Sequence, residues 1–295
     1  MKLRTNVDRL VKLAVVGKVA QPLLRGYQVS PTGRPTILPV LGGIVYNVKC
    51  GSPATGWAGD HIEPAVALDL PRTDADAVRA LNTCAQIGNP ARVLGGAAKG
   101  ARGVVTGKHG GIEHVHVDFA QRDLEKLTVG DQVLIEACGL GMELADFPDV
   151  KVMNLDPGLL AKLRLSNAGG RLVVPVAMEI PAEIMGSGLG QNQCQSGDYD
   201  IQMTDPDAVR RWGLDRLRLG DFVAVLDADH SYGRIFRKGA VSIGVVVHCD
   251  CVGAGHGPGL TTVFTSAKGR IEPRVAKGAN VADILGIGAS RGARR

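Results

Sequence analysis

Two similar stretches occur in this chain, LTVGDQV at residues 127–133 and LRLGDFV at residues 217–223, and each predicts the start of a strand. In both, a Gly-Asp pair separates a short apolar segment from a valine-containing run, and glycine and aspartate are preferred where a tight turn reverses the chain. Such turns are common in β-barrels and sandwiches. The echo leaves two interpretations open, a duplicated β domain or two ordinary turns, and both predict strands that start near Gln132 and Phe222.

Outward from these stretches, short runs rich in Val and Ile and bounded by Gly, Pro or Asp predict further strands. The predicted strands are Thr36–Val40, Ile44–Lys49, Arg102–Thr106, His114–Phe119, Gln132–Ala137, Arg171–Met178, Phe222–Leu226 and Val241–His248. Helical patterns with Thr or Asp at their starts are scarcer. They cover Thr73–Ile87, Asp156–Leu165 and Thr204–Leu217, the last with Gly213 placed to interrupt it. The predicted fold class is α+β and β-rich, with two β-sandwich or barrel-like domains and a few peripheral helices.

A chain of 295 residues is long enough for two domains. The small polar and glycine cluster Ser166–Gly170 is the best boundary. It divides the chain into an N-terminal β-rich domain, residues 1–168, and a C-terminal β-rich domain with a basic tail, residues 169–295. We expect the functional site between them. Because β-rich domains must cover their sheet edges, we also expect a homo-oligomer.

Composition excludes several classes of partner. The net charge is +5, and three of the positive charges lie in the tail, residues 290–295, where a solvated terminus is the favoured interpretation. Stripes of mixed aromatic and basic residues are missing, so nucleic acid is not expected as a partner. The six cysteines show no disulfide spacing. No apolar run approaches the ~18 residues of a membrane span, and no secretory signal is evident, which predicts a cytoplasmic protein without membrane contact.

All seven histidines lie in short segments dense in glycine and acid. These are AGDHIEP (58–64), GKHGGIEHVHVDF (107–119), LDADHSYGR (226–234) and VVHCDCVGAGHGPG (246–259). Histidine and carboxylate side chains together bind divalent metals or move protons near neutral pH. The segments therefore predict one active site assembled from several loops.

Three further patterns could contribute to that site. His114, His116 and Asp118 alternate along a predicted strand, so they share one face and suit either a metal site or a polar outer surface. The stretch 95–111 combines glycines with cations, as in an anion nest or a flexible hairpin. The loop 192–200 carries amides and carboxylates that could bind a hard cation and an amide substrate.

The motifs AGDHIEP, TGKHGGIEHVHVDF and VVHCDCVGAGHGPG resemble, over nearly the full length, an uncharacterised prokaryotic family catalogued only as a domain of unknown function. That resemblance implies no particular activity. Leu172–Asp200 is also similar to the acetamidase/formamidase family, whose D-x-H-x-x-Q-G-D-G-E run binds metal. Gln195, Gly197, Asp198 and Asp200 are similar to the end of that run, but Ser196 interrupts it and the Asp-x-His part is missing, so only Asp198 and Asp200 are carried over. This second resemblance implies metal-dependent amide hydrolysis.

These patterns together predict a metal-assisted hydrolase of a small amide, cyclic amide or related C–N bond, with zinc, manganese or iron as cofactor. In this mechanism the metal polarises the carbonyl and lowers the pKa of a bound water to about 7. The predicted metal ligands are His61, Asp198, His248 and Asp250; the predicted catalytic acid–base residues are His256, Glu63, Asp60 and His109; and the predicted substrate-binding residues are Lys108, Arg102, Asn192 and Gln193. Two alternatives remain open: a non-catalytic β protein that binds a metal or small ligand, and a metal-free acid–base lyase or isomerase.

Overall fold

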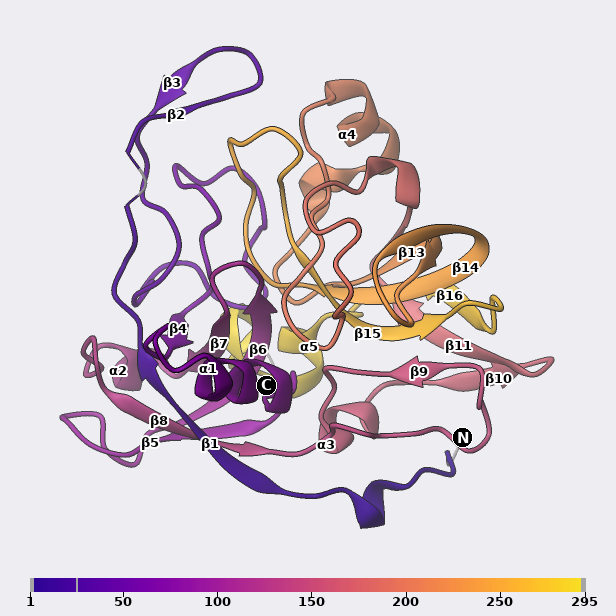
Figure 1. Cartoon of the computed structure of the whole chain (residues 1–295), viewed down its shortest axis with the longest axis horizontal. Coiled ribbons are helices and arrows are strands. Elements are labelled where there is room, and N and C mark those ends of the chain that lie inside the picture. The colour runs from indigo at the N-terminus through magenta and orange to yellow at the C-terminus, as the bar shows by residue number, and fades with distance from the viewer. Residues whose placement is uncertain (1–2, 25, 293–295) are drawn as a thin grey trace.

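The computed structural model describes residues 3–24 and 26–292 and has the predicted β-rich fold. Its N-terminal half forms a closed antiparallel barrel in the strand order β1-β4-β7-β6-β5-β8. The barrel strands are β1 (Leu13–Val19), β4 (Val66–Asp69), β5 (Pro90–Val93), β6 (Arg102–His109), β7 (His114–Phe119) and β8 (Gln132–Ala137). A separate hairpin of β2 (Gln28–Val29) and β3 (Pro35–Thr36) projects away from the barrel (Figure 1).

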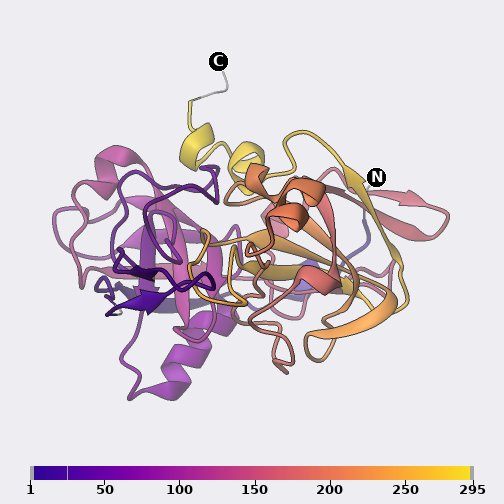
Figure 2. The ribbon, with the colours of Figure 1, turned by 90° about the horizontal axis from the view of Figure 1, so that it is seen from above.

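The C-terminal half contains a five-stranded sheet in the order β12-β13-β14-β15-β9 and a three-stranded sheet in the order β10-β11-β16. Their strands are β9 (Lys151–Val152), β10 (Ser166–Ala168), β11 (Arg171–Val176), β12 (Met178–Pro181), β13 (Phe222–Asp229), β14 (Ile235–Val246), β15 (Leu260–Ser266) and β16 (Ile271–Val275). Figure 2 shows the two halves as neighbouring lobes. Because β9 joins the C-terminal sheet from before residue 168, the boundary at 168/169 stays a prediction.

The two echoed stretches form the same turn. Gly130 and Gly220 have φ values of 90° and 88°, a left-handed conformation that favours glycine. In each turn the following aspartate accepts a hydrogen bond from the amide three residues upstream, at 2.9 Å for Asp131 and 2.8 Å for Asp221. The sequence similarity therefore reflects one local structure, which starts a barrel strand in one half and a sheet strand in the other.

Helices are short, and the N-caps of the three predicted ones lie within one residue of their expected starts at Thr73, Asp156 and Thr204. The helices are α1 (Ala75–Cys84), α2 (Gln121–Leu124), α3 (Pro157–Leu160), α4 (Pro206–Trp212) and α5 (Val281–Leu285), with 3-10 turns η1 (Val7–Arg9), η2 (Ala182–Ile184), η3 (Leu214–Arg216) and η4 (Gly288–Ser290). Asp74, Asp156 and Asp205 cap α1, α3 and α4 with their carboxylates. Gly213 adopts a left-handed φ of 63° and ends α4, so it interrupts the predicted helix.

Three predicted strands do not form as expected. Arg171–Met178 is divided between β11, which ends at Val176, and β12, which starts at Met178 in another sheet. The other two hardly form. Thr36–Val40 contributes only Thr36 to β3, and Ile44–Lys49 makes only an isolated bridge from Ile44 to Val66. Both segments belong to the irregular chain between β1 and β4, which carries the glycines Gly42 and Gly43 at positive φ. Strand β14 also ends at Val246, before His248. The predicted strand Val241–His248 is therefore two residues too long at its C-terminal end.

The apolar core is divided into separate clusters. One fills the barrel and includes Val66, Val117 and Ile135. Two others lie mainly under the C-terminal sheets and contain, among others, Phe222 and Val223 respectively. Polar side chains from 60–63, 108–116 and 198–200 are buried although they belong to none of these clusters. The fold thus leaves a buried polar region where loops from both halves meet.

Candidate metal centre

Six of the seven histidines converge in that polar region. His109 stacks on His248 with ring centroids 4.2 Å apart, and His61 lies 5.2 Å from His248. His61 also contacts His256 edge-on at 5.4 Å, while His116 is 6.3 Å from His109. These rings come from segments far apart in the sequence. The site that the sequence predicted as an assembly of loops is therefore one continuous cluster.

Glu63 lies at the centre of the barrel side of this cluster. Its Oε1 is 2.7 Å from His109 Nδ1, and its two oxygens lie 3.0 and 2.8 Å from His114 Nδ1. His116 Nε2 is 3.1 Å from Glu63 Oε1 without hydrogen-bond geometry. Among the described residues, neither ring nitrogen of this fully buried histidine has a hydrogen-bond partner. Such a nitrogen is costly to bury unless it binds something else.

Asp198 and His248 form the C-terminal side of the cluster. Asp198 Oδ2 lies 2.6 Å from His248 Nε2, and its Oδ1 accepts a hydrogen bond from the Gly110 amide at 2.6 Å. The other ring nitrogen of His248, Nδ1, donates to the Cys249 carbonyl at 2.8 Å, which fixes the ring and leaves Nε2 facing the cluster. Gly259 packs against this pair so closely that a Cβ atom would collide with both side chains.

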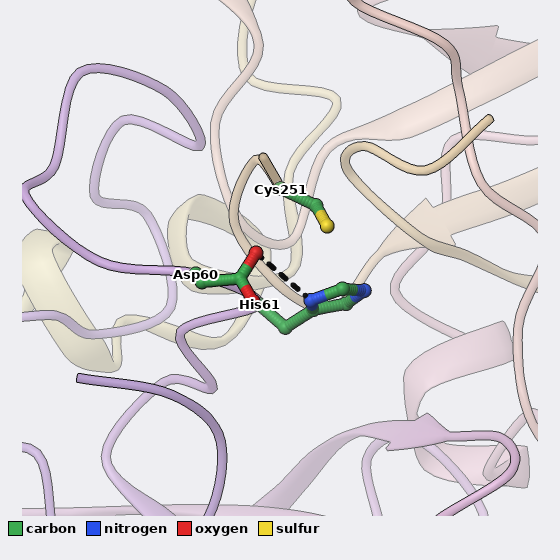
Figure 3. Close-up of side chains that lie close together, drawn as sticks. All are labelled: Asp60, His61 and Cys251. Atoms are coloured by element: carbon green, nitrogen blue, oxygen red, sulfur yellow. Dashed lines mark hydrogen bonds and ion pairs between the residues drawn. The ribbon is translucent and has the colours of Figure 1, made fainter. Parts of the chain in front are cut away.

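An outer group extends the cluster beyond His61. The His61 Nδ1 atom is 3.2 Å from Asp60 Oδ1, and Cys251 points toward the same carboxylate (Figure 3). Asp200 and His256 approach His61 as well. His256 and Cys251 are half-buried, so this side of the cluster is the one nearer to solvent.

Four carboxylates are buried in the cluster with histidine as their counter-charge. The exposed fractions are 1% for Asp60, 1% for Glu63, 8% for Asp198 and 5% for Asp200. Within residues 3–24 and 26–292, none of the four forms an ion pair with lysine or arginine. Burying so much negative charge is unfavourable unless positive charge is close by. Histidinium or a bound metal must therefore supply it.

The electrostatics follow from the same contacts. Burial alone would raise the pKa of Glu63, but His114 and His116 hold it well below its usual range. Burial acts in the same direction on Asp198, and His109 and His248 lower its pKa instead. Burial lowers the pKa of His109, as does the neighbouring His248. The carboxylates are thus held in the deprotonated form that metal coordination requires.

The geometry offers four groups of metal-ligand atoms within 4.8 Å of one another. They are Glu63, His109 and His116; His109, Asp198 and His248; His61, Asp200 and His256; and Asp60, His61 and Cys251. Three protein ligands of the His and carboxylate type suffice for a metal site with an open coordination position. Among the described residues, His109 joins the first two groups and His61 joins the last two. The two pairs adjoin where His248 Nε2 lies 3.5 Å from Asp200 Oδ1.

Several predicted residues do not join the cluster. Asp250 lies beside it, but its carboxylate accepts from the Cys251 amide and belongs to none of the four groups. The fully buried Lys108 ammonium donates to Asn154 Oδ1 at 2.8 Å and to the Gln195 carbonyl at 3.1 Å, and so is not free to anchor an anion. Arg102 is exposed at the far end of β6, roughly 23 Å from His109 at 3.3 Å per strand residue.

Two cavities lie on the neighbouring surface. A cavity of about 1180 Å³ is lined by Asn192, Gln193 and His230, among others, and by no member of the histidine cluster. A second cavity of about 420 Å³ touches the cluster at His114 and also contains Arg72 and Gln193. The roles predicted for Asn192 and Gln193 in binding substrate therefore stay predictions that depend on these cavities.

The structure places the alternating residues His114, His116 and Asp118 in two different environments. Both histidines face Glu63, whereas Asp118 Oδ2 lies 2.7 Å from Arg291 Nη2 and accepts from the Gly288 amide at 3.1 Å. Asp118 therefore holds the C-terminal segment against the barrel. The seventh histidine, His230, is also separate, since its Nδ1 bonds Thr262 Oγ1 at 2.8 Å.

Comparisons with known proteins place the chain in a family. Residues 27–161 match the N-terminal model and residues 162–285 the C-terminal model of the domain of unknown function DUF4438. The chain belongs to this family. It is similar to a protein of known crystal structure, TM1086, with 49% identity and a TM-score of 0.91 over 96% of this chain and 99% of that chain. Among curated proteins none matches. These matches give no support to the acetamidase/formamidase resemblance.

Among the described residues, no helix has the length and apolar character needed to cross a membrane. The longest described helix, α1, has 10 residues.

Proposed function

We propose that this protein binds a divalent metal in its histidine cluster and uses it to hydrolyse a small amide, cyclic amide or related C–N bond. One observation carries the proposal. Four carboxylates are buried together with five histidines of the cluster, and the described structure provides neither lysine nor arginine to balance them. Glu63, His109, His116, Asp198 and His248 would be the main ligands, and zinc, manganese or iron suits this nitrogen and oxygen set.

The proposed role of each residue follows from its position in the cluster. When bound, the metal would polarise the substrate carbonyl and provide a water with a pKa near 7. Asp198 and Glu63 would fix the histidine rings through the short contacts described above. His256 is a half-buried histidine on the side nearer to solvent, a suitable position from which to accept a proton.

A second candidate function is metal binding without turnover. It is favoured by the depth of the ligands, because His116 and His248 have exposed fractions of 0%. Of the cluster residues, the 420 Å³ cavity is lined only by His114. Glu63 contacts both His114 and His109, so His109 lies beyond Glu63 from this cavity. A substrate would need an opening beyond this cavity to reach the inner ligands.

Metal-dependent turnover of small amides and lactams separates these candidates. The full-length protein would be stripped with a chelator, reloaded with zinc, manganese or iron, and assayed with a panel of such substrates. We expect turnover after reloading, its loss in His116→Gln, and its retention in His230→Gln, a buried histidine outside the cluster. Metal uptake without turnover would support the second candidate. Turnover that survives chelation would overturn both and favour a metal-free acid–base lyase or isomerase.

A further inference from the structure

Within the outer group, Asp60, His61 and Cys251 differ in chemistry from the rest of the cluster because they include a thiol (Figure 3). Cys249, two residues earlier, is buried in the apolar core beside Ile62 and Leu260. Cys251 instead leaves the core, since β14 has already ended at Val246 and the chain turns. Its thiol therefore faces a carboxylate and an imidazole, two other metal-ligand types.

We infer that Asp60, His61 and Cys251 form a second metal site, selective for a thiophilic divalent ion such as Zn²⁺ or Co²⁺. The ligand atoms lie within 4.8 Å of one another, with His61 Nδ1 and Asp60 Oδ1 3.2 Å apart. Tetrahedral zinc with bonds of ~2.0–2.3 Å spaces its ligands by about 3.3–3.6 Å. Because the ligand atoms already lie within 4.8 Å of one another, the thiol would need to move by no more than about 1.5 Å to complete this geometry.

The surroundings of these ligands suit coordination. Asp60 Oδ2 accepts from Gln28 Nε2 at 2.9 Å, and its Oδ1 accepts from the Val252 amide at 3.0 Å. The Gly253 amide donates to Cys251 Sγ at 3.1 Å. Such hydrogen-bond partners orient the side chains that bind a metal. Burial and the Asp60 carboxylate raise the pKa of the Cys251 thiol, and the Gly253 amide acts in the opposite direction, so the metal itself must displace the thiol proton.

Binding is a simple exchange of protons for metal. One divalent ion forms bonds to the carboxylate oxygen, the imidazole nitrogen and the sulfur, and the Cys251 thiol releases one proton to solvent. Three protein ligands leave a fourth position open to water. Because thiolate prefers soft or borderline ions, Mg²⁺ and Ca²⁺ should not compete for this site. It is separate from the inner ligands Glu63, His116 and Asp198, and its occupancy does not depend on the proposed hydrolase activity.

Cobalt titration of the metal-stripped full-length protein tests this site. We expect a thiolate-to-cobalt charge-transfer band in the near ultraviolet that saturates with Co²⁺, is displaced by Zn²⁺ and is unaffected by Mg²⁺ or Ca²⁺. Cys251→Ser should abolish the band and weaken Co²⁺ binding at this site by at least about 100-fold. Removing a residue that only hydrogen-bonds to a metal ligand weakens metal affinity by about 10- to 100-fold, so the loss of a ligand should exceed that effect. The matched control Cys249→Ser, the neighbouring core thiol, should retain the band.

Two further variants keep the test independent of folding and of the inner centre. Asp60→Asn retains an oxygen acceptor for the Val252 amide but is a weaker ligand, so the band should require more Co²⁺. His116→Gln should lose inner metal and keep the band. The inference is overturned if wild-type protein shows no band, or if Cys251→Ser shows the same one. A band in wild-type protein that binds no metal at the inner ligands would reject the proposed function alone.

Discussion

Gly259→Ala is the sharpest steric test of the inner metal centre. A Cβ at this position would lie 2.6 Å from His248 Cδ2 and still closer to His248 Nε2 and Asp198 Oδ2. Relative to ordinary contact, each of these two ligand atoms would overlap the new methyl group by roughly 1 Å or more. Gly259 is not among the glycines with positive φ, so alanine is allowed there by the backbone and the effect is one of space alone.

The displaced ligands cannot retreat easily, because His248 is fully buried and its Nδ1 is bonded to the Cys249 carbonyl. Metal bonds tolerate changes of only about 0.2 Å, so a shift of this size should weaken metal affinity by at least about 100-fold. Overpacking should also lower the free energy of unfolding by about 1–3 kcal/mol.

Elemental analysis and melting with and without chelator would measure both effects. Gly95→Ala is the matched control, since a Cβ added there would meet nothing within 4 Å and the φ of Gly95 is not positive. We expect the control to keep its metal. Full metal content and an unchanged chelator response in Gly259→Ala would refute the reasoning.

Three further predictions concern residues outside the metal ligands. Burial, followed by the charge of Arg234, lowers the pKa of His230 to about 3. In the unfolded chain this histidine takes up a proton near pH 6.5, so the free energy of unfolding should fall by about 1.4 kcal/mol per pH unit below pH 6.5. Chemical denaturation measured across pH should show a shallower fall in His230→Gln. Asp118→Ala should lose about 1–3 kcal/mol of stability in urea titrations, through its lost bond to Arg291, with unchanged metal content. Asp156→Ala removes the cap of α3 and should lower stability by about 0.5–2 kcal/mol in the same assay.

Sequence patterns predict the strands best where local preference and burial agree. The predicted limits of His114–Phe119 and Gln132–Ala137 match β7 and β8. The segment Ile44–Lys49 has strand-like composition but lies in the irregular chain between β1 and β4, where it pairs only at Ile44. Strand formation there depends on a partner in the tertiary structure, which composition does not contain.

The site is predictable in its residue types but not in its pairings. Histidines beside acids indicate one cluster, and Glu63, His109, Asp198 and His248 do meet. For His116, the alternation with His114 favours a shared face but leaves a ligand role and a polar outer surface equally open, and the structure turns its ring toward Glu63.

The sequence leaves the contacts of two members of the outer group, Cys251 and Asp200, undetermined. A strand that continued to Asp250 would turn Cys251 into the core together with Cys249, whereas β14 ends at Val246. Asp200 stands out in the sequence through the carboxylates of the loop 192–200 and its partial match to a metal-binding run, and neither predicts that it joins His61 and His256. Neither contact has a local signal, because each joins segments brought together by the junction of barrel and sheet.

The central claim is that the buried cluster holds a divalent metal, and elemental analysis of the purified full-length protein tests it most directly. We predict at least one equivalent of zinc, manganese or iron per chain, and a lower melting temperature once a chelator has removed it. Protein without metal, whose melting is unchanged by chelator and by added zinc, manganese or iron, would contradict the claim.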